Sequence, residues 1–149
     1  MVMKLEYDRS LHEREYRAGP FNITEEMVRG FSRSIGETNP IFTDPVAAQA
    51  AGYRGVVAPP TLCTLLVRQV ELPGLDLKFG RVQFHAGQRV QPRAPIVAGD
   101  ALTASSRLKE VYPKTGRSGT MVFIVWETTF HNQDGVVVAE VQESYARRE

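Results

Sequence analysis

The second half of the chain alternates between hydrophobic and polar positions, as β-strands do when they bury one face. Residues 101–112 and 119–131 show this over long runs, and 82–86 and 136–145 show it over shorter ones. In the two long runs the positions of one face are Leu102, Ala104, Ser106 and Leu108, then Val122, Ile124, Trp126 and Phe130. An Asp-Gly turn signal at 134–135 joins the last two strands. The sequence therefore predicts a long antiparallel hairpin within a larger antiparallel sheet.

The first half has helical spacing instead. A short strand is expected near 13–21, followed by a helix over 25–35. The apolar positions of this helix are Met27, Val28, Phe31 and Ile35. Asn22 or Thr24 can cap its start, because a short polar side chain accepts from the free N–H groups of the first turn. Gly36 can end it in a left-handed conformation.

One further segment, 61–70, predicts a helix that is apolar on most sides, and Leu72-Pro73-Gly74 ends it. An element of this kind has to be buried on most sides. A sheet must also bury one face, and this is the only strongly apolar helix in the chain. We therefore expect an α+β fold in which a long, curved antiparallel sheet wraps around a central apolar helix. No linker or repeat divides the chain, so residues 1–149 are interpreted as one domain.

The loop over residues 34–45 lies between two predicted helices and is the first candidate for a site. It combines Gly36, Glu37 and Asn39 with two prolines and a second carboxylate. Such a loop holds a fixed shape and presents polar groups. Asp44 and Pro45 then have the order of an N-cap and a first helical residue.

Composition narrows the function further. The chain has 149 residues and a formal net charge of +1, which gives no electrostatic reason to expect nucleic acid or an anionic membrane as a partner. A single cysteine, Cys63, excludes an internal disulfide and fits a reducing compartment. The first nine residues lack the apolar core of a signal peptide, so we expect a cytoplasmic protein. Metal-ligand spacing and a phosphate-binding glycine loop are both absent from the sequence.

Four strings, in order along the chain, carry a family resemblance. They are Ile35-Gly36-Glu37-Thr38-Asn39-Pro40-Ile41-Phe42, Gly55-Val56-Val57-Ala58-Pro59-Pro60-Thr61, Phe84-His85-Ala86-Gly87-Gln88-Arg89-Val90 and Arg93-Ala94-Pro95-Ile96-Val97-Ala98-Gly99-Asp100-Ala101-Leu102. Together they resemble the MaoC-like hydratases and dehydratases, which have the hot-dog fold. The resemblance extends over roughly residues 8–146.

The resemblance implies (R)-specific hydration of 2-enoyl thioesters or dehydration of (3R)-hydroxyacyl thioesters. The thioester would be carried by coenzyme A or acyl carrier protein, with no resident cofactor. Water addition next to a thioester carbonyl needs a base, an acid and donors for the developing enolate oxygen. In the family, Asp and His of a Gly-Asp-x-Asn-Pro-x-His loop move the protons, and a backbone N–H near the start of the central helix faces the carbonyl.

This chain departs from that pattern at three of the positions that matter. Glu37 stands where the family has Asp, and Phe42 stands where it has His, while Asn39 is retained. Pro60 stands where active members have glycine, so a backbone donor is missing as well. Phenylalanine can neither accept nor donate a proton. A complete catalytic set is therefore not expected in this chain.

The same departures resemble the non-catalytic, substrate-binding half of two-part MaoC-like dehydratases. On this interpretation the chain is a lyase subunit of fatty acid metabolism that binds the acyl chain. It works as a homodimer or as a heterodimer with a catalytic MaoC-like subunit. Glu37 and Asn39 are the remaining candidates for a catalytic role. The expected substrate-binding residues are Phe42, Tyr53, Val57, Thr61 and His85.

Other functions remain open at this point. The chain could be a self-sufficient hydratase with a rearranged site that uses Glu37 or His85. It could instead be a binding module that holds acyl thioesters without turnover. A thioesterase on the same fold generally needs a carboxylate on or near the central helix, and 61–69 contains none.

Each candidate residue also has a plain structural interpretation. Glu37 can be a surface carboxylate, and Asn39 can stabilise an Asx-type turn before the following proline. Phe42 can be a packing residue, and His85 can be a structural histidine of a strand. Cys63 lies near a helix N-terminus, where a thiol pKa can fall, but no base partner is evident, and a buried apolar cysteine is expected.

Overall fold

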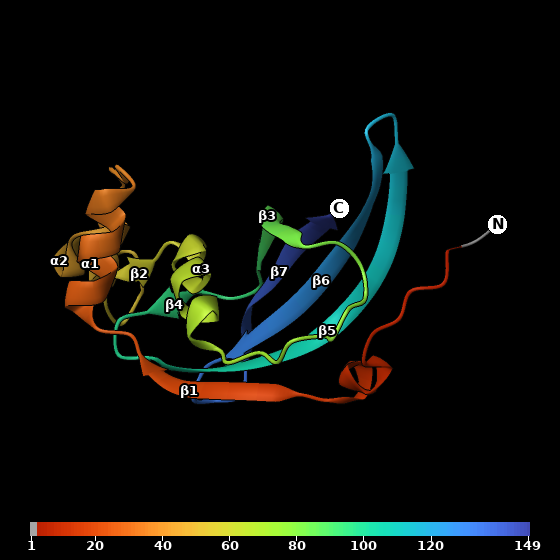
Figure 1. Ribbon diagram of the computed structural model, residues 1–149. Coiled ribbons are helices and arrows are strands. Elements are labelled where there is room, and N and C mark those ends of the chain that lie inside the picture. The colour runs from red at the N-terminus through yellow and green to blue at the C-terminus, as the bar shows by residue number, and fades with distance from the viewer. Residues whose placement is uncertain (1–2) are drawn as a thin grey trace.

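The computed structural model describes residues 3–149 (Figure 1). Long strands dominate it, and its helices are short. Its helices are the 3₁₀ segments η1 (Arg9–Glu13), η2 (Pro40–Phe42), η3 (Pro60–Leu62) and η4 (Val67–Gln69) and the α-helices α1 (Glu25–Ser34), α2 (Pro45–Ala50) and α3 (Cys63–Leu66). Its strands are β1 (Tyr16–Asn22), β2 (Val57–Ala58), β3 (Val82–Pro92), β4 (Ile96–Val97), β5 (Ala101–Gly116), β6 (Gly119–His131) and β7 (Val137–Arg148).

Five of the strands form one antiparallel sheet in the order β1-β5-β6-β7-β3. The predicted hairpin is β6 and β7, with 13 and 12 residues. The sheet is strongly curved, and α3 lies on its concave side, while α1 and α2 lie together at one end (Figure 1). A small second sheet of β2 and β4 joins the helical end to the strands. This is the predicted arrangement of a curved sheet around a central helix.

The central helix differs from its prediction in regularity. Residues 60–69 are a 3₁₀ turn, a four-residue α-helix and a second 3₁₀ turn, not one continuous helix. Leu65 is 48% exposed, so one side of the segment is open. Cys63 and Leu66 are buried against the sheet, as expected. Pro59 and Pro60, at the start of the segment, supply no N–H groups, and four residues are too few to propagate a regular helix.

The core has two parts. The first lies between the central helix and the concave face of the sheet, and includes Leu62, Leu66, Leu102, Phe130 and Val141. The second covers the outer ends of the long strands, which the short helix does not reach. Its members are Leu5, Leu11, Leu75, Leu77, Leu108, Val122, Ile124 and Trp126. The N-terminal segment and the stretch after the central helix therefore complete the burial of the sheet, which the sequence pattern had not indicated.

The first helix begins and ends as predicted. Of the two candidate caps, Thr24 is the one used, since its side chain accepts from the Met27 N–H. Glu25 and Glu26 occupy the first turn, where the helix dipole favours acidic residues. Gly36 follows the helix with a φ of +72°, in the left-handed region. Asp44 caps α2, and Pro45 is its first residue, also as predicted.

Ser32 of α1 is fully buried, and its hydroxyl has no hydrogen-bond partner among residues 3–149. We expect Ser32→Ala to raise the free energy of unfolding by about 0.5–1 kcal/mol, because it removes an unpaired buried polar group. Urea unfolding measures this directly. Ser34→Ala is the control: that exposed hydroxyl donates to the Phe31 carbonyl at 2.7 Å, so the substitution should bring a smaller gain or none. A loss of 1 kcal/mol or more in Ser32→Ala would contradict the unpaired hydroxyl.

Candidate functional site

A small apolar pocket of about 350 Å³ opens where the loop 34–45 meets the start of the central helix. Its walls come from η2, from β2, from the beginning of η3 and from the segment between β3 and β4. The lining residues are Ile41, Phe42, Tyr53, Val57, Ala58, Pro60, Pro92, Arg93, Ala94, Pro95 and Ile96. Three predicted substrate-binding residues, Phe42, Tyr53 and Val57, are thus brought together.

The loop beside the pocket uses its own polar side chains to keep its shape. Glu37 Oε1 accepts from the backbone N–H groups of Thr38 and Asn39, at 3.0 and 3.1 Å. Asn39 Oδ1 accepts from the Ile41 N–H at 3.2 Å and caps η2. Neither Glu37 nor Asn39 lines the pocket. Both polar groups are therefore engaged in turn formation, in the way short polar side chains stabilise turns.

The chemistry available inside the pocket is limited. Among the described residues that line it, none is a carboxylic acid, a histidine or a cysteine. Pro60 forms part of the wall and has no N–H to donate. Thr61, also a predicted site residue, is exposed and outside the lining, with its carbonyl accepting from the Thr64 hydroxyl. The pocket can bind an apolar group, but its walls contain no proton-transfer pair.

His85, the fifth predicted binding residue, is not at the pocket. It lies on β3, where Nε2 is hydrogen-bonded to the buried carboxylate of Glu143 on β7. The side-chain amide of Gln88 donates to the other oxygen of the same carboxylate. Burial, and to a lesser extent the charge of Glu143, raises the pKa of Tyr145, whose ring meets the His85 ring edge-on at 5.5 Å. His85 and Gln88 therefore give each oxygen of the buried Glu143 carboxylate a hydrogen-bond partner.

Sequence reasoning missed half of the pocket wall. Pro92, Arg93, Ala94, Pro95 and Ile96 line it, and none of them was among the predicted site residues. The signal that could have found them is the pairing of two very short strands. Val57 pairs with Val97 and Ala58 with Ile96, which places this proline-containing segment opposite the loop.

A buried carboxylate holds the helical end of the molecule to the sheet. Asp100 is 1% exposed and accepts from Arg54 Nη2 at 2.7 Å and from Gln133 Nε2 at 3.0 Å. Its other oxygen accepts from the Val97 N–H at 2.9 Å. These three donors come from the segment before β2, the turn between β6 and β7, and β4. Asp100 therefore fixes the strand pair that forms two walls of the pocket.

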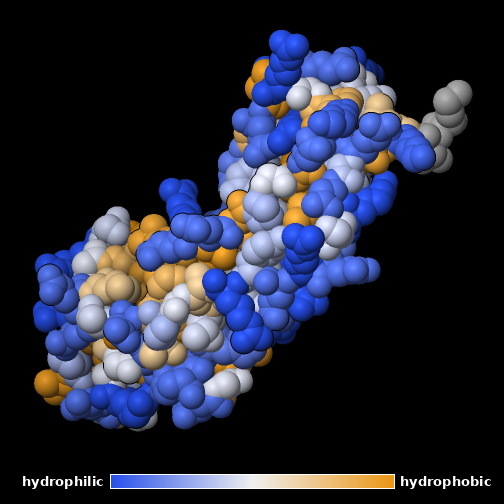
Figure 2. Space-filling view, turned by 60° about the horizontal axis from the view of Figure 1, so that its bottom comes forward, coloured by the Kyte–Doolittle hydropathy of each residue, from blue (hydrophilic) through white to orange (hydrophobic). Residues whose placement is uncertain are grey.

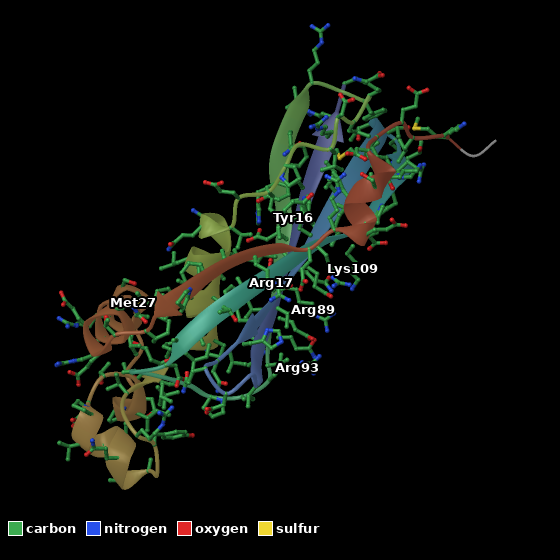
Figure 3. The ribbon with its side chains drawn as sticks, turned by 90° about the horizontal axis from the view of Figure 1, so that it is seen from below. Tyr16, Arg17, Met27, Arg89, Arg93 and Lys109 are labelled. Carbon is green, nitrogen blue, oxygen red and sulfur yellow. The ribbon has the colours of Figure 1, made fainter. Side chains whose placement is uncertain are left out.

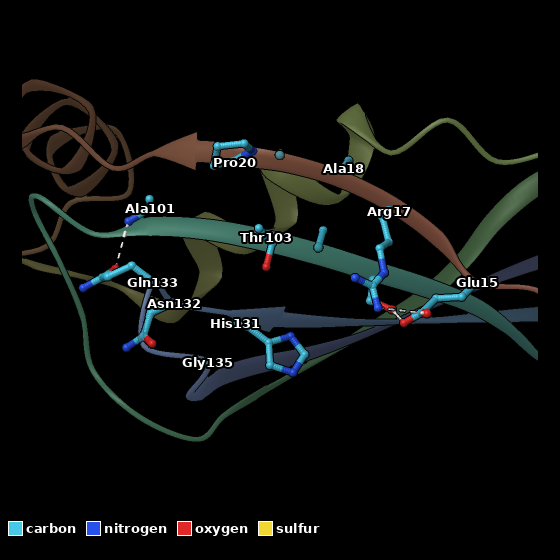
Figure 4. Close-up of a pocket in the computed structure, with 13 residues that line it drawn as sticks. Glu15, Arg17, Ala18, Pro20, Ala101, Thr103, His131, Asn132, Gln133 and Gly135 are labelled. Atoms are coloured by element: carbon cyan, nitrogen blue, oxygen red, sulfur yellow. Dashed lines mark hydrogen bonds and ion pairs between the residues drawn. The ribbon is translucent and has the colours of Figure 1, made fainter.

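A larger cavity, of about 780 Å³, lies elsewhere, on the convex side of the sheet (Figure 4). Its lining includes Arg17, Thr103 and His131, and it contains no predicted site residue. Figure 4 shows Arg17 paired with Glu15 beside it. We place the candidate site at the smaller pocket, because that pocket contains the loop and the start of the central helix.

Other kinds of site find no support in residues 3–149. They contain no group of three His, Cys, Asp or Glu side chains placed to hold a metal ion. Burial raises the pKa of the Cys63 thiol to about 12, so it is not an activated nucleophile. Within the same residues, no helix is long and apolar enough to cross a bilayer.

A curved antiparallel sheet around a short central helix, with a pocket at the start of that helix, is the hot-dog fold of the MaoC-like hydratases and dehydratases. The chain belongs to the family described as "FAS1-like, dehydratase domain region", whose model matches residues 11–141. A UPF0336 protein of Parafrankia sp. is 38% identical over 125 residues, which are 81% of this chain and 80% of that relative. A UPF0336 protein of Streptomyces avermitilis is 35% identical over 115 residues, 73% of this chain and 76% of the relative.

Three solved structures have the same fold. The HadBC (3R-hydroxyacyl-ACP dehydratase) complex of Mycobacterium tuberculosis matches with a TM-score of 0.74 and 25% identity, covering 98% of this chain and 99% of the matched one. The R-hydratase PhaJ1 of Pseudomonas aeruginosa has the same fold, with a TM-score of 0.66 and 22% identity over all of this chain and 83% of that one. The ChsH1–ChsH2 complex of M. tuberculosis matches with a TM-score of 0.71 and 21% identity, over 93% of this chain and 87% of the other.

Proposed function

We propose that this chain is the acyl-chain-binding, non-catalytic subunit of a MaoC-like enoyl-thioester hydratase or hydroxyacyl-thioester dehydratase. One observation supports this above the others. The pocket at the loop has Phe42 in place of the family's His, and its walls offer no base. Glu37 is engaged with the backbone of its own loop. The site has kept a cavity but not the groups that would move protons.

The pocket suits an apolar ligand of modest size. Its volume of about 350 Å³ is at the lower end of the range for small-molecule sites. Phe42, Val57 and Ile96 form an apolar wall, which favours an apolar chain by about 25 cal/mol per Å² of surface removed from water. An acyl chain can pack against this wall, whereas a polar substrate would lose its hydration there.

The catalytic partner would pair along β3. This strand is one edge of the main sheet, and it leaves Val82 and Phe84 47% and 40% exposed. The opposite edge, β1, is seven residues long, and its register is interrupted around Pro20, which protects an edge against pairing. An open edge of eleven residues with exposed apolar side chains requires cover. Two of the structural relatives, HadBC and ChsH1–ChsH2, are complexes of two chains.

The carrier, the partner and the location of the chain follow from the chemistry of adding water to an enoyl thioester or removing it from a hydroxyacyl thioester. The thioester carrier is coenzyme A or acyl carrier protein, and no resident cofactor is required for adding or removing water. The partner is a hot-dog chain with an intact Gly-Asp-x-Asn-Pro-x-His loop, or a second copy of this chain. Cys63 is unpaired, and with the reactions of fatty acid metabolism this supports a cytoplasmic location.

The pocket is tested by shortening its aromatic wall. Phe42→Ala is expected to weaken the binding of octanoyl-CoA about tenfold, because it removes apolar surface from contact with the chain. Isothermal titration calorimetry measures the dissociation constant. Tyr112→Ala is the matched control, since Tyr112 stacks on Phe123 outside the pocket, and its affinity should not change. Equal affinities in both variants and the wild type would mean that the acyl chain does not bind at Phe42.

A further inference from the structure

A row of aromatic side chains crosses the main sheet far from the pocket. Tyr112 of β5 pairs with Phe123 of β6, which in turn pairs with Ala146 of β7. Phe84 of β3 pairs with the same Ala146 from the other side. Direct partners on neighbouring strands place their side chains on one face of a sheet. These four residues therefore form one line across four strands, which we call the aromatic row.

The aromatic row lies on the convex face, opposite the core. Ile124 follows Phe123 along β6 and belongs to the second part of the core, and successive residues of a strand point to opposite faces. Ala146 is fully buried, yet it belongs to neither part of the core. Phe84 is 40% and Tyr112 37% exposed, and the Tyr112 ring stacks on Phe123 at 5.3 Å. The row is thus an apolar band at the surface, with a small residue between its aromatic rings.

The row and the pocket are at opposite ends of the sheet. Phe84 and Pro92 of the pocket wall are eight positions apart on β3, which is about 25 Å along a strand. The outer ends of β5 and β6 lie across the molecule from α1 and α2 (Figure 1). At this end, the upper right of Figure 2, hydrophobic side chains reach the surface among hydrophilic ones. A ligand on the row would therefore not touch an acyl chain in the pocket.

Cations outnumber carboxylates around the row. Lys114 and Arg148 lie on its outer flank, are exposed, and make no ion pair within residues 3–149. Glu110 lies on the inner flank, and Figure 3, which looks onto the convex face, shows Arg89 and Lys109 on that side. From the Arg107–Glu127 pair outward, the strands of this face and the chain end carry five cations and three carboxylates, namely Arg89, Arg107, Lys109, Lys114 and Arg148 against Glu110, Glu127 and Glu149.

The dimensions of the row match one α-helix. Neighbouring strands lie about 4.8 Å apart and a helix rises about 5.4 Å per turn, so a helix along the row presents about one turn to each strand. Four strands span about 14 Å, which corresponds to roughly ten residues of helix. Apolar residues at positions i, i+3, i+4 and i+7 would cover Tyr112, Phe123 and Phe84. Acidic residues along one side of the same helix would face Lys114 and Arg148.

We propose that the aromatic row is a docking surface for an amphipathic helix of a partner protein, apolar toward the row and acidic toward Lys114 and Arg148. This partner differs from the catalytic hot-dog chain, because a chain that pairs along β3 extends the sheet and leaves its convex face open. The excess of cations favours an acidic partner over a second copy of this face, whose charge has the same sign. The inference goes beyond the proposed function and does not depend on it.

The test uses a stapled, fluorescein-labelled helical peptide of about 15 residues, with Leu at helical spacing and Glu along one side. Fluorescence anisotropy with the full chain should show binding that weakens about tenfold when Lys replaces Glu in the peptide, and that also weakens in about 500 mM salt. Tyr112→Ser and Lys114→Glu should each weaken binding of the acidic peptide at least about fivefold. Val136→Ser is the matched control, because Val136 is an exposed apolar residue outside the row, and it should bind as the wild type does.

Each outcome decides for or against the helix. Equal affinity for the acidic and basic peptides, no binding of either, or unchanged affinity in both variants would overturn the docking surface. Circular dichroism checks that the variants fold, and Lys114→Glu, at an exposed side chain, carries the test if Tyr112→Ser does not fold. Self-association of the chain in sedimentation velocity, lost in Tyr112→Ser, would replace the helix with a second copy. Binding to phosphatidylglycerol vesicles without peptide binding would replace it with a lipid surface.

Discussion

The purified chain alone is expected to leave crotonyl-CoA unhydrated, and addition of a catalytic hot-dog partner is expected to raise the rate by at least about 10⁴-fold. General acid–base catalysis contributes about 10²–10⁴, and donors to a developing oxyanion add about 10²–10³. The pocket is lined by Phe42 and Pro60, which offer neither a base nor a backbone N–H, and no lining residue is a carboxylic acid or a histidine, so neither contribution is expected from this chain. The absorbance of the enoyl thioester follows the reaction.

The matched variants for this experiment are Glu37→Gln and His85→Ala, the two residues that a rearranged active site would use. Glu37→Gln should not change the rate of the two-chain complex by more than about twofold, because Glu37 does not line the pocket. His85 lies on the β3 edge, so His85→Ala should lower the rate only by weakening the pairing, and excess partner should restore it. Turnover by the isolated chain that either variant abolishes would establish the self-sufficient enzyme instead. Tight binding of octanoyl-CoA without turnover in any pairing would favour a binding module.

Asp100→Ala is expected to lower the free energy of unfolding by about 2–4 kcal/mol, which is large against the marginal stability of a domain. The substitution removes the acceptor for Arg54, Gln133 and the Val97 N–H at once. Of these donors, the Val97 N–H belongs to a buried residue and would be left without its partner, and an unmade buried hydrogen bond carries the full desolvation cost. Arg54 is 66% exposed and can return to water, which keeps the estimate below that for a fully buried ion pair.

Comparing the urea unfolding of Asp100→Ala with that of Asp134→Ala distinguishes the loss of the Asp100 hydrogen bonds from the general effect of removing a carboxylate. Asp134 is exposed in the turn between β6 and β7, and its loss should cost less than about 0.5 kcal/mol. Because Asp100 fixes β4 against β2, Asp100→Ala should also weaken the binding of octanoyl-CoA. Similar stabilities of the two variants would show that Asp100 does not hold the helical end to the sheet.

The long strands were predictable because their pattern is simple. Alternation over Leu102, Ala104 and Leu108 identified the buried face of β5, and the Asp-Gly signal placed the hairpin turn. Burial of the outer strand ends was not predictable, because Leu5, Leu75 and Leu77 lie outside helices and strands and Leu11 lies in a five-residue 3₁₀ helix, so none has a period to detect. The central helix was predicted as continuous, since apolar composition does not distinguish an α-helix from alternating 3₁₀ turns.

The part of the site formed by the loop 34–45 was predictable from the sequence. The part that depends on which strands pair with each other was not. Phe42, Tyr53 and Val57 were expected to meet, and they line one pocket. His85 was grouped with them because its string also resembled the family, but β3 carries it to Glu143 on the adjacent strand instead. Glu143 itself gave no signal, since one acidic residue in an alternating strand normally faces water. The wall from Pro92 to Ile96 depended on two strands of only two residues each.

On the proposed function, the pocket beside Phe42 holds the acyl chain while a partner performs the chemistry. Photolabelling of the bound chain locates it. A decanoyl-CoA with a diazirine at the end of its chain is bound to the two-chain complex, irradiated, and the labelled peptides are identified by mass spectrometry. We expect label on the segments that contain Phe42, Tyr53 or Pro92–Ile96 of this chain, and loss of that label in Phe42→Asp. Label confined to the partner chain, or on the His85 segment of this one, would mean that the acyl chain lies elsewhere.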